Sequence, residues 1–190
     1  MKKNLISALI CAMVLLSGCD KLKDATSLDF TVNNISFAFK ATVQDDPTTL
    51  SGEASVTTRA AAMRSFTVTR TVAISEIGSS DVDKYASKIS KALVNAAMVS
   101  VATVPSGSYT VTDLTITATG VPGSIVIPAY TIGDDFTEPS GMSVYMGALI
   151  MQLINAGTIT VTVSGQTDAP AGTILTVSCK SDVVFTASLL

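Results

Sequence analysis

The sequence predicts a mainly β protein, an antiparallel β-sandwich with one or two helices. Four segments alternate Val, Ile or Phe with small or polar residues, and they cover residues 35–40, 66–74, 159–164 and 183–189. This period of two is typical of strands with one wet face and one buried face. Turn residues separate these segments, as in Pro105-Ser106-Gly107, so the strands are expected to pair as antiparallel neighbours.

The strand predicted at 66–74 carries one charged residue on its apolar side. Arg70 lies between Val68 and Val72 on that side. An arginine can bury its aliphatic stem while its guanidinium stays in water. We therefore expect this strand to lie at an edge of the sandwich.

A first helix is predicted at 80–97. Ser80 can cap its first turn, where two aspartates also suit the helix dipole. Apolar residues at helical spacing on one face are Val82, Tyr85, Ala86, Ile89, Ala92, Leu93, Ala96 and Ala97. We expect Ile89 and Leu93, one turn apart on this face, to pack against a sheet.

Three lysines fall away from that apolar face. Lys84, Lys88 and Lys91 are interpreted as a solvated helix surface, with a basic binding strip as the alternative.

A second helix is predicted at 143–155, where Gly157 is placed to end it. The segment is apolar nearly all round, with Gln152 as the main exception. This composition indicates a helix buried between layers. A pair of buried strands is the alternative, because periodicity does not separate the two for a short apolar run.

The two helical regions resemble each other at a spacing of sixty residues. Residues 93–97 (Leu-Val-Asn-Ala-Ala) align with 153–157 (Leu-Ile-Asn-Ala-Gly). A strand is predicted before each helix and a β-rich stretch after it. This pattern indicates one strand–helix–strand–strand unit used twice, and a chance match is the alternative.

The N-terminus has the layout of a secretory signal peptide. Lys2 and Lys3 precede an apolar run at 5–16 that only Ser7 interrupts. This run is shorter than the about 20 residues of a membrane-spanning helix.

The run ends in Leu16-Ser17-Gly18-Cys19, which resembles the lipobox of bacterial lipoproteins. The resemblance implies cleavage before Cys19, acylation of that residue and attachment to the membrane through the lipid. It divides the chain into a signal peptide (1–18), a lipidated tether (19–27) and a single β-rich domain (28–190).

The predicted location is the outer membrane, on its periplasmic face or at the cell surface. An acidic stretch beginning at Asp20 and a Thr-rich β domain resemble the surface lipoproteins of Bacteroidota. In enteric-type bacteria, Asp20 would instead resemble an inner-membrane retention signal, so the inner membrane is the alternative.

Charge argues against a nucleic-acid partner. The chain has 12 basic and 15 acidic residues, and removal of Lys2 and Lys3 with the signal leaves a net charge of −5. A weakly acidic surface does not attract phosphate backbones or anionic headgroups.

Missing residue types argue against catalysis. The chain has no histidine, which excludes a Ser-His-Asp triad, a Cys-His pair and any metal site built on His. Cys179 is expected to be a buried thiol, since Cys11 leaves with the signal and Cys19 carries lipid. We predict no enzymatic activity, no catalytic residue and no cofactor.

Two acidic clusters are candidate calcium sites because calcium binds oxygen ligands. They are Asp45-Asp46 and Asp134-Asp135 with Glu138. The cluster at Asp134 is the better candidate but matches no EF-hand spacing, so we interpret both clusters as solvated loop acids and predict no metal site.

Three functional hypotheses follow. The preferred one is a membrane-anchored lipoprotein with a structural or protein-binding role at the envelope. The second is an envelope carrier of apolar ligands or lipids that uses a cavity beside the apolar helix at 142–154. The third is a pilin-like or adhesion subunit, which would expose a long groove or an unpaired edge strand.

Overall fold

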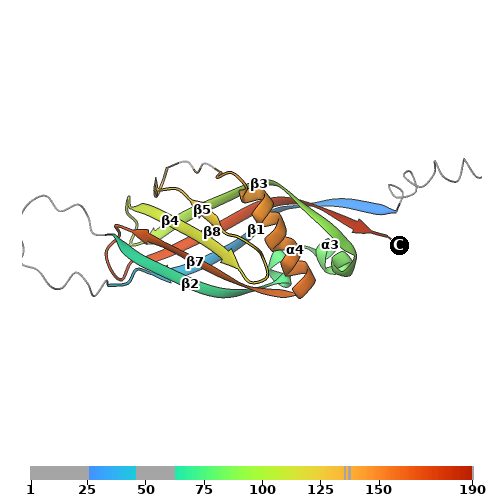
Figure 1. The fold of residues 1–190 in the computed structure, drawn as a ribbon, viewed down its shortest axis with the longest axis horizontal. Helices are drawn as coiled ribbons and strands as arrows, with labels where there is room; N and C mark the ends of the chain where they lie inside the picture. The colour runs from blue at the N-terminus through green and yellow to red at the C-terminus, as the bar shows by residue number, and fades with distance from the viewer. Residues whose placement is uncertain (1–25, 46–62, 135, 137, 190) are drawn as a thin grey trace, which may run out of the picture.

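Two antiparallel sheets form the protein (Figure 1). The computed structural model describes residues 26–45, 63–134, 136 and 138–189. One sheet has the order β1 (Ser27–Thr42), β8 (Ile174–Ser188) and β3 (Ile89–Val104). The other has the order β2 (Arg64–Ala73), β7 (Thr158–Thr167), β4 (Thr110–Ala118) and β5 (Ile125–Ile127), and β6 (Tyr130–Thr131) also pairs with β4. The prediction of a mainly β antiparallel sandwich is confirmed.

Helical segments connect or cover these strands. They are η2 (Ile74–Ile77), α3 (Ser80–Tyr85), η3 (Ala86–Lys88) and α4 (Met142–Ala156). Within the described part of the chain, none of them has the length and hydropathy to span a membrane.

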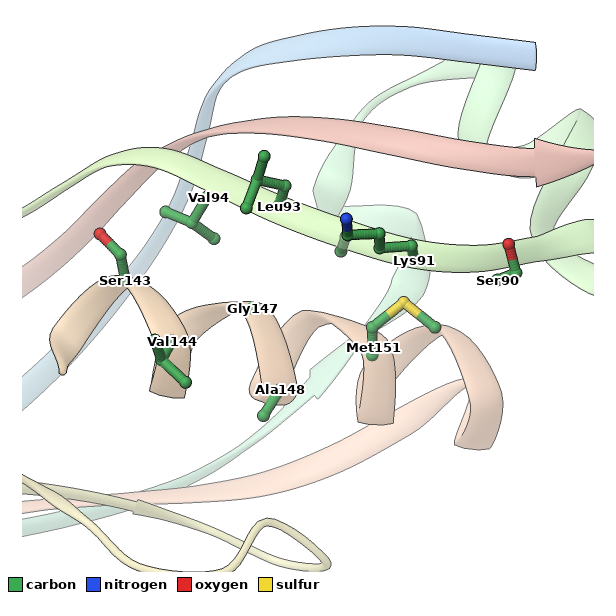
Figure 2. Close-up of a pocket in the computed structure, with 10 residues that line it drawn as sticks. Ser90, Lys91, Leu93, Val94, Ser143, Val144, Gly147, Ala148 and Met151 are labelled. Atoms are coloured by element: carbon green, nitrogen blue, oxygen red, sulfur yellow. The ribbon is translucent and has the colours of Figure 1, made fainter. Parts of the chain in front are cut away.

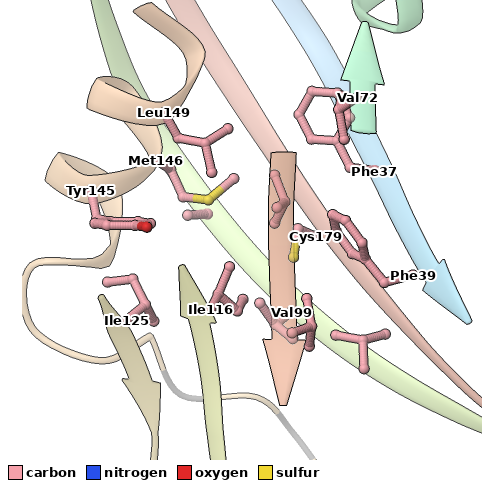
Figure 3. Packing of buried hydrophobic residues seen from close by; sticks show 14 of the residues in the cluster. Phe37, Phe39, Val72, Val99, Ile116, Ile125, Tyr145, Met146, Leu149 and Cys179 are labelled. Carbon is pink, nitrogen blue, oxygen red and sulfur yellow. The ribbon is translucent and has the colours of Figure 1, made fainter. Parts of the chain in front are cut away.

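The core lies between the two sheets and beneath α4 (Figure 3). Phe37 and Phe39 of β1 face inward with Cys179 of β8, while Met146 and Leu149 enter the same core from α4. Each of these side chains is at most 3 % exposed. The helix therefore belongs to the hydrophobic core of the sandwich.

The threonine face of the second sheet is turned to solvent, as the alternation predicts. Thr69 of β2 pairs with Thr162 of β7, and their hydroxyl oxygens lie 2.9 Å apart. The neighbouring residues Val72, Val161 and Val163 point inward and are buried.

Arg70 lies on an edge strand of the sandwich, as expected. Strand β2 ends the order of its sheet. The Arg70 guanidinium donates to the carbonyl oxygen of Ala38 at 3.0 Å and pairs with Glu76 at 2.5 Å. Since Ala38 lies on β1, the edge strand of the other sheet, Arg70 ties the two sheets together along one side.

Two β-bulges flank the same residue of the central strand β8. Both strands that pair with β8 have a register shift next to Asp182. In β1 the shift lies between Val32 and Ile35, and in β3 it lies between Val94 and Ala96. Bulges bend a strand and increase its twist. The sheet accordingly curves beyond this point, and β1 shows the bend clearly (Figure 2).

Helix α3 and the short turn η3 pack under the curved end. The Tyr85 ring lies 6.0 Å from that of Phe30 on β1, and Phe30 lies 5.4 Å from Phe185 on β8. This aromatic cluster covers the inner face of the sheet beyond the bulges.

The helix predicted at 80–97 is wrong beyond Lys88. Helix α3 ends at Tyr85, Ser79 rather than Ser80 caps it, and β3 begins at Ile89. The apolar spacing looked helical because two register shifts interrupt the period of two in β3. Its buried positions are Ile89, Val94, Ala97, Val99, Val101 and Thr103.

The prediction that Leu93 packs against a sheet from the apolar face of a helix is therefore also wrong. Its side chain is 51 % exposed, whereas Ile89 is 7 % exposed and belongs to the core.

The second predicted helix is confirmed. Helix α4 runs Met142–Ala156, and Gly157 ends it with a positive φ of 75° and an N–H bond to the carbonyl oxygen of Leu153. Eight of its residues are buried. Val144 is nevertheless 79 % exposed, so the expectation that the helix is buried between layers is wrong for its outer side.

The predicted duplication is not a structural repeat at the proposed spacing. Residues 93–97 lie in β3, whereas the aligned residues 153–157 form the end of α4. The order strand, helix, strand, strand does occur twice. However, the strand after α3 joins the three-stranded sheet and the strand after α4 joins the other sheet.

Candidate functional site

Helix α4 exposes an apolar ridge. The helix contains no charged residue. Val144, Ala148 and Met151 lie at helical spacing on one side of the helix. Val144 is 79 % exposed and Ala148 is also exposed, whereas Met151 is partly buried and packs against the core. A surface helix normally places charged and polar residues there, so this ridge is unusual for a solvent-facing surface.

The helix packs tightly against the edge of β3. A β-carbon at Gly147 would lie 3.2 Å from the carbonyl oxygen of Ala92 and 3.8 Å from a methyl group of Val94. Glycine at this position allows the helix to touch the strand backbone. Helix α4 thus covers part of the edge that β3 would otherwise present.

A groove of about 340 Å³ follows this junction (Figure 2). Its β3 wall consists of Ser90, Lys91, Ala92, Leu93 and Val94. Its α4 wall consists of Ser143, Val144, Gly147, Ala148 and Met151. The walls are mostly apolar, and the two serines and Lys91 supply the polar groups.

Lys91 is the charged residue of the groove. Its side chain is exposed, and no carboxylate of the described residues lies within ion-pair distance of it. The site therefore combines exposed apolar side chains with one positive charge, which has no ion-pair partner among the described residues.

The three predicted surface lysines do not form one strip on one helix. Lys84 lies on α3, Lys88 on η3 and Lys91 on β3. The Lys84 ammonium sits 4.9 Å from the Tyr85 ring centre, and a hydrogen bond to Tyr85 raises the Lys84 pKa. Only Lys91 lines the groove.

Glu138 has a structural partner at the start of α4. Its carboxylate accepts a hydrogen bond from the backbone N–H of Ser143 at 3.1 Å and another from the Ser143 hydroxyl. A carboxylate is favourable at a helix N-terminus because of the helix dipole.

The other acidic residues of the two predicted clusters do not form a metal site among the described residues. Asp45 and Asp134 lie in the described residues, while Asp46 and Asp135 lie outside them. Among the residues that can be placed, no three His, Cys, Asp or Glu side chains gather as metal ligands.

Cys179 is a core thiol, as predicted. It lies on the inward side of β8 with Leu175 and Val177, and it is 2 % exposed. Burial raises the pKa of its thiol to about 12. The thiol is therefore protonated at neutral pH.

Cys19, the predicted lipidation site, lies outside the described residues, as do the signal peptide and most of the tether. Strand β1 begins at Ser27, which pairs with Ser188, while Ile89 pairs with the adjacent Ala187. The chain thus enters the sandwich at the end of the sheet where the β3 wall of the groove begins.

The groove was missed because its β3 wall was predicted to be helical. The available signal was the absence of charge around the whole circumference of the helix at 143–155. A helix buried on all sides and a helix with a partner on one side have the same composition, so this signal alone does not locate a groove.

No family model matches this chain, and no curated protein or solved structure matches it. The functional assignment therefore rests on the residues of the groove and on the N-terminal motif.

Proposed function

We propose that this protein is a membrane-anchored lipoprotein with a protein-binding role at the cell envelope. Acylated Cys19 would hold it at a membrane, the outer membrane being preferred. The α4–β3 groove would bind the partner without catalysis. The observation that carries this proposal is the exposed apolar ridge of α4 beside the half-exposed Leu93.

The groove chemistry favours a partner with apolar side chains next to a carboxylate. Apolar groups that enter the groove would cover Val144, Ala148 and Met151, and each buried CH₂ contributes about 0.8 kcal/mol. A carboxylate nearby would pair with Lys91. Partial desolvation would strengthen that pair relative to one on an open surface.

The anchor would keep the groove near the membrane. A chain from Cys19 to Thr26 has eight residues, which span at most about 28 Å when extended. The β3 wall begins at the end of the sheet where this chain enters. A partner embedded in or attached to the same membrane would therefore be within reach.

An envelope carrier of apolar ligands or lipids is the second candidate. The observation that favours it is the 340 Å³ volume of the groove beside α4. Ligand sites usually enclose most of the ligand surface, however, whereas both walls of this groove expose apolar side chains to solvent. This openness favours a protein partner.

Photocross-linking in the native host tests the proposal. A photoreactive residue at Val144 should yield one protein adduct of defined mass. The same residue at Thr69, exposed on the opposite sheet, should yield none. Equal adducts from both positions, or no adduct from Val144, would contradict a partner site. A small lipid mass on Val144 would instead support the carrier.

A further inference from the structure

The α4–β3 groove has opposite charges at its two ends. Beside the C-terminal half of α4, Lys91 lies next to Met151 (Figure 2), and Lys88 of η3 directly precedes the same β3 wall. Before the N-terminal end of the helix lies Glu138, whose carboxylate accepts a hydrogen bond from the backbone N–H of Ser143 at 3.1 Å. The three charged residues are exposed, so their charges act on whatever docks at the groove.

The ridge between these two ends complements itself. Helix α4 carries no charge, and its exposed side chains between Ser143 and Met151 are Val144 and Ala148. An interface around a two-fold axis pairs the same surface of both copies, so that surface has to be self-complementary. Two copies of this ridge bring no like charges together at such an axis, and both sides are apolar.

The direction of the charges selects one arrangement of two copies. With the two α4 helices parallel, the Lys91 ends of both copies would meet, and so would the Glu138 ends. With the helices antiparallel, the Lys91 end of each copy lies against the Glu138 end of the other. Opposite charges then face each other on both sides of the axis, which favours the antiparallel arrangement and disfavours the parallel one.

We propose that the partner of the α4–β3 groove is a second copy of this chain, docked around a two-fold axis with the α4 helices antiparallel and Lys91 of each copy near Glu138 of the other. This inference rests on the proposed function, because it names the partner of the same groove. The second copy supplies both groups that the groove chemistry favours, which are apolar side chains and a carboxylate.

Attachment to one membrane would assist this pairing. The exposed ridge is narrow, and a small contact alone gives weak association. Two copies anchored through Cys19 would share one membrane surface, which raises the effective concentration of each copy for the other. A contact too weak to hold two copies together in dilute solution would therefore hold them at the membrane.

Disulfide cross-linking through Ala148, near the middle of the ridge, tests the pairing in membranes of the native host. Ala148→Cys in the full chain places two thiols near the axis, and mild oxidation should yield a covalent dimer of twice the chain mass. Thr69→Cys, at an exposed position of β2, is the matched control and should stay monomeric. Wild type should also stay monomeric, since Cys179 is buried. Absence of the Ala148→Cys dimer would overturn the proposal.

Exchange of the two charges tests the direction of docking. Lys91→Glu should lower the yield of the Ala148→Cys dimer by about tenfold, because Glu138 of the other copy then meets a like charge. Glu138→Lys should lower it similarly. When the two variants carry different tags and are expressed together, the mixed dimer regains both pairs of opposite charges and should form at the original yield. A mixed dimer as scarce as the dimers of either single variant would contradict antiparallel docking.

Glu138→Gln separates the charge of this residue from its hydrogen bond to Ser143. The amide keeps an oxygen that accepts from the Ser143 N–H, so α4 should start at the same residue and the melting temperature should be unchanged. The dimer yield should fall about threefold, as expected for loss of an exposed ion pair. An unchanged yield would contradict the pairing of Glu138 with Lys91.

The photo-adduct at Val144 distinguishes failure of this inference from failure of the proposed function. An adduct of twice the chain mass supports both. An adduct with a different protein overturns the second copy as partner and leaves the proposed function standing. Lack of any protein adduct overturns both.

Discussion

Gly147 of α4 lies so close to Ala92 of β3 that a β-carbon on the glycine would sit 3.2 Å from the Ala92 carbonyl oxygen. The neighbouring atom belongs to a strand backbone that is paired with β8 and has little freedom to move. This contact fixes the distance between the two walls of the groove.

Gly147→Val should therefore separate the walls and destabilise the fold by about 1–3 kcal/mol. Ala148→Val is the matched control, because Ala148 is exposed on the same helix and its change costs only helix propensity, about 0.6 kcal/mol. Urea denaturation measures both. Equal losses for the two variants would mean that the helix does not touch β3 at Gly147.

Ile89 and Leu93 should respond very differently to truncation. Ile89→Ala removes a core side chain and should cost about 2–5 kcal/mol. Leu93→Ala removes a half-exposed side chain on a strand and should cost less than about 1 kcal/mol. Similar large losses for both variants would restore the helical assignment, in which the two residues share a buried face.

These two residues also show where prediction from the sequence stops. The alternation at 159–164 identified β7 correctly because that strand has a regular register across its pairing with β2. Strand β3 contains two register shifts, and its buried residues Ile89, Val94 and Ala97 lie five and three residues apart, which breaks the period of two. Such bulges depend on the partner strand, and the local sequence of β3 does not contain that information.

Of the two walls of the groove, only the α4 wall was predictable from the sequence. The charge-free composition and Gly157 indicated helix α4 and its end. The neighbour of its exposed ridge, Leu93, is 51 residues away from Val144 along the chain and meets it only through tertiary packing.

Cys179 should make the fold sensitive to alkaline pH. Its pKa is raised from 9.0 to about 12, so above pH 9 the unfolded chain loses the thiol proton while the folded chain keeps it. The associated stability is present below pH 9 and falls by up to about 1.4 kcal/mol per pH unit between pH 9 and 12.

Urea denaturation from pH 8 to 11 measures this slope. Cys179→Ala should flatten it, leaving the later decrease that the raised pKa of Tyr130 predicts. An identical slope with and without the thiol would exclude Cys179 as its source.

Membrane attachment should depend on Cys19. Cys19→Ala should abolish incorporation of labelled fatty acid and move the protein out of the detergent phase, because two or more acyl chains are needed for stable anchoring. Cys179→Ala is the control and should retain both label and partitioning. Unchanged labelling of the Cys19 variant would contradict the lipoprotein assignment.

The central claim is that the α4–β3 groove binds a protein partner. The most direct test measures the yield of the cross-linked adduct that a photoreactive residue at Met151 forms with this partner. Val144→Asp places a charge on the exposed apolar ridge, and Lys91→Glu reverses the charge of the groove. Both changes lie at exposed side chains and should leave the melting temperature within a few degrees of the wild type. Each should reduce the adduct by at least about tenfold, whereas Thr69→Asp on the opposite sheet should leave it unchanged. An adduct from Met151 that persists at full yield in both groove variants would contradict the claim.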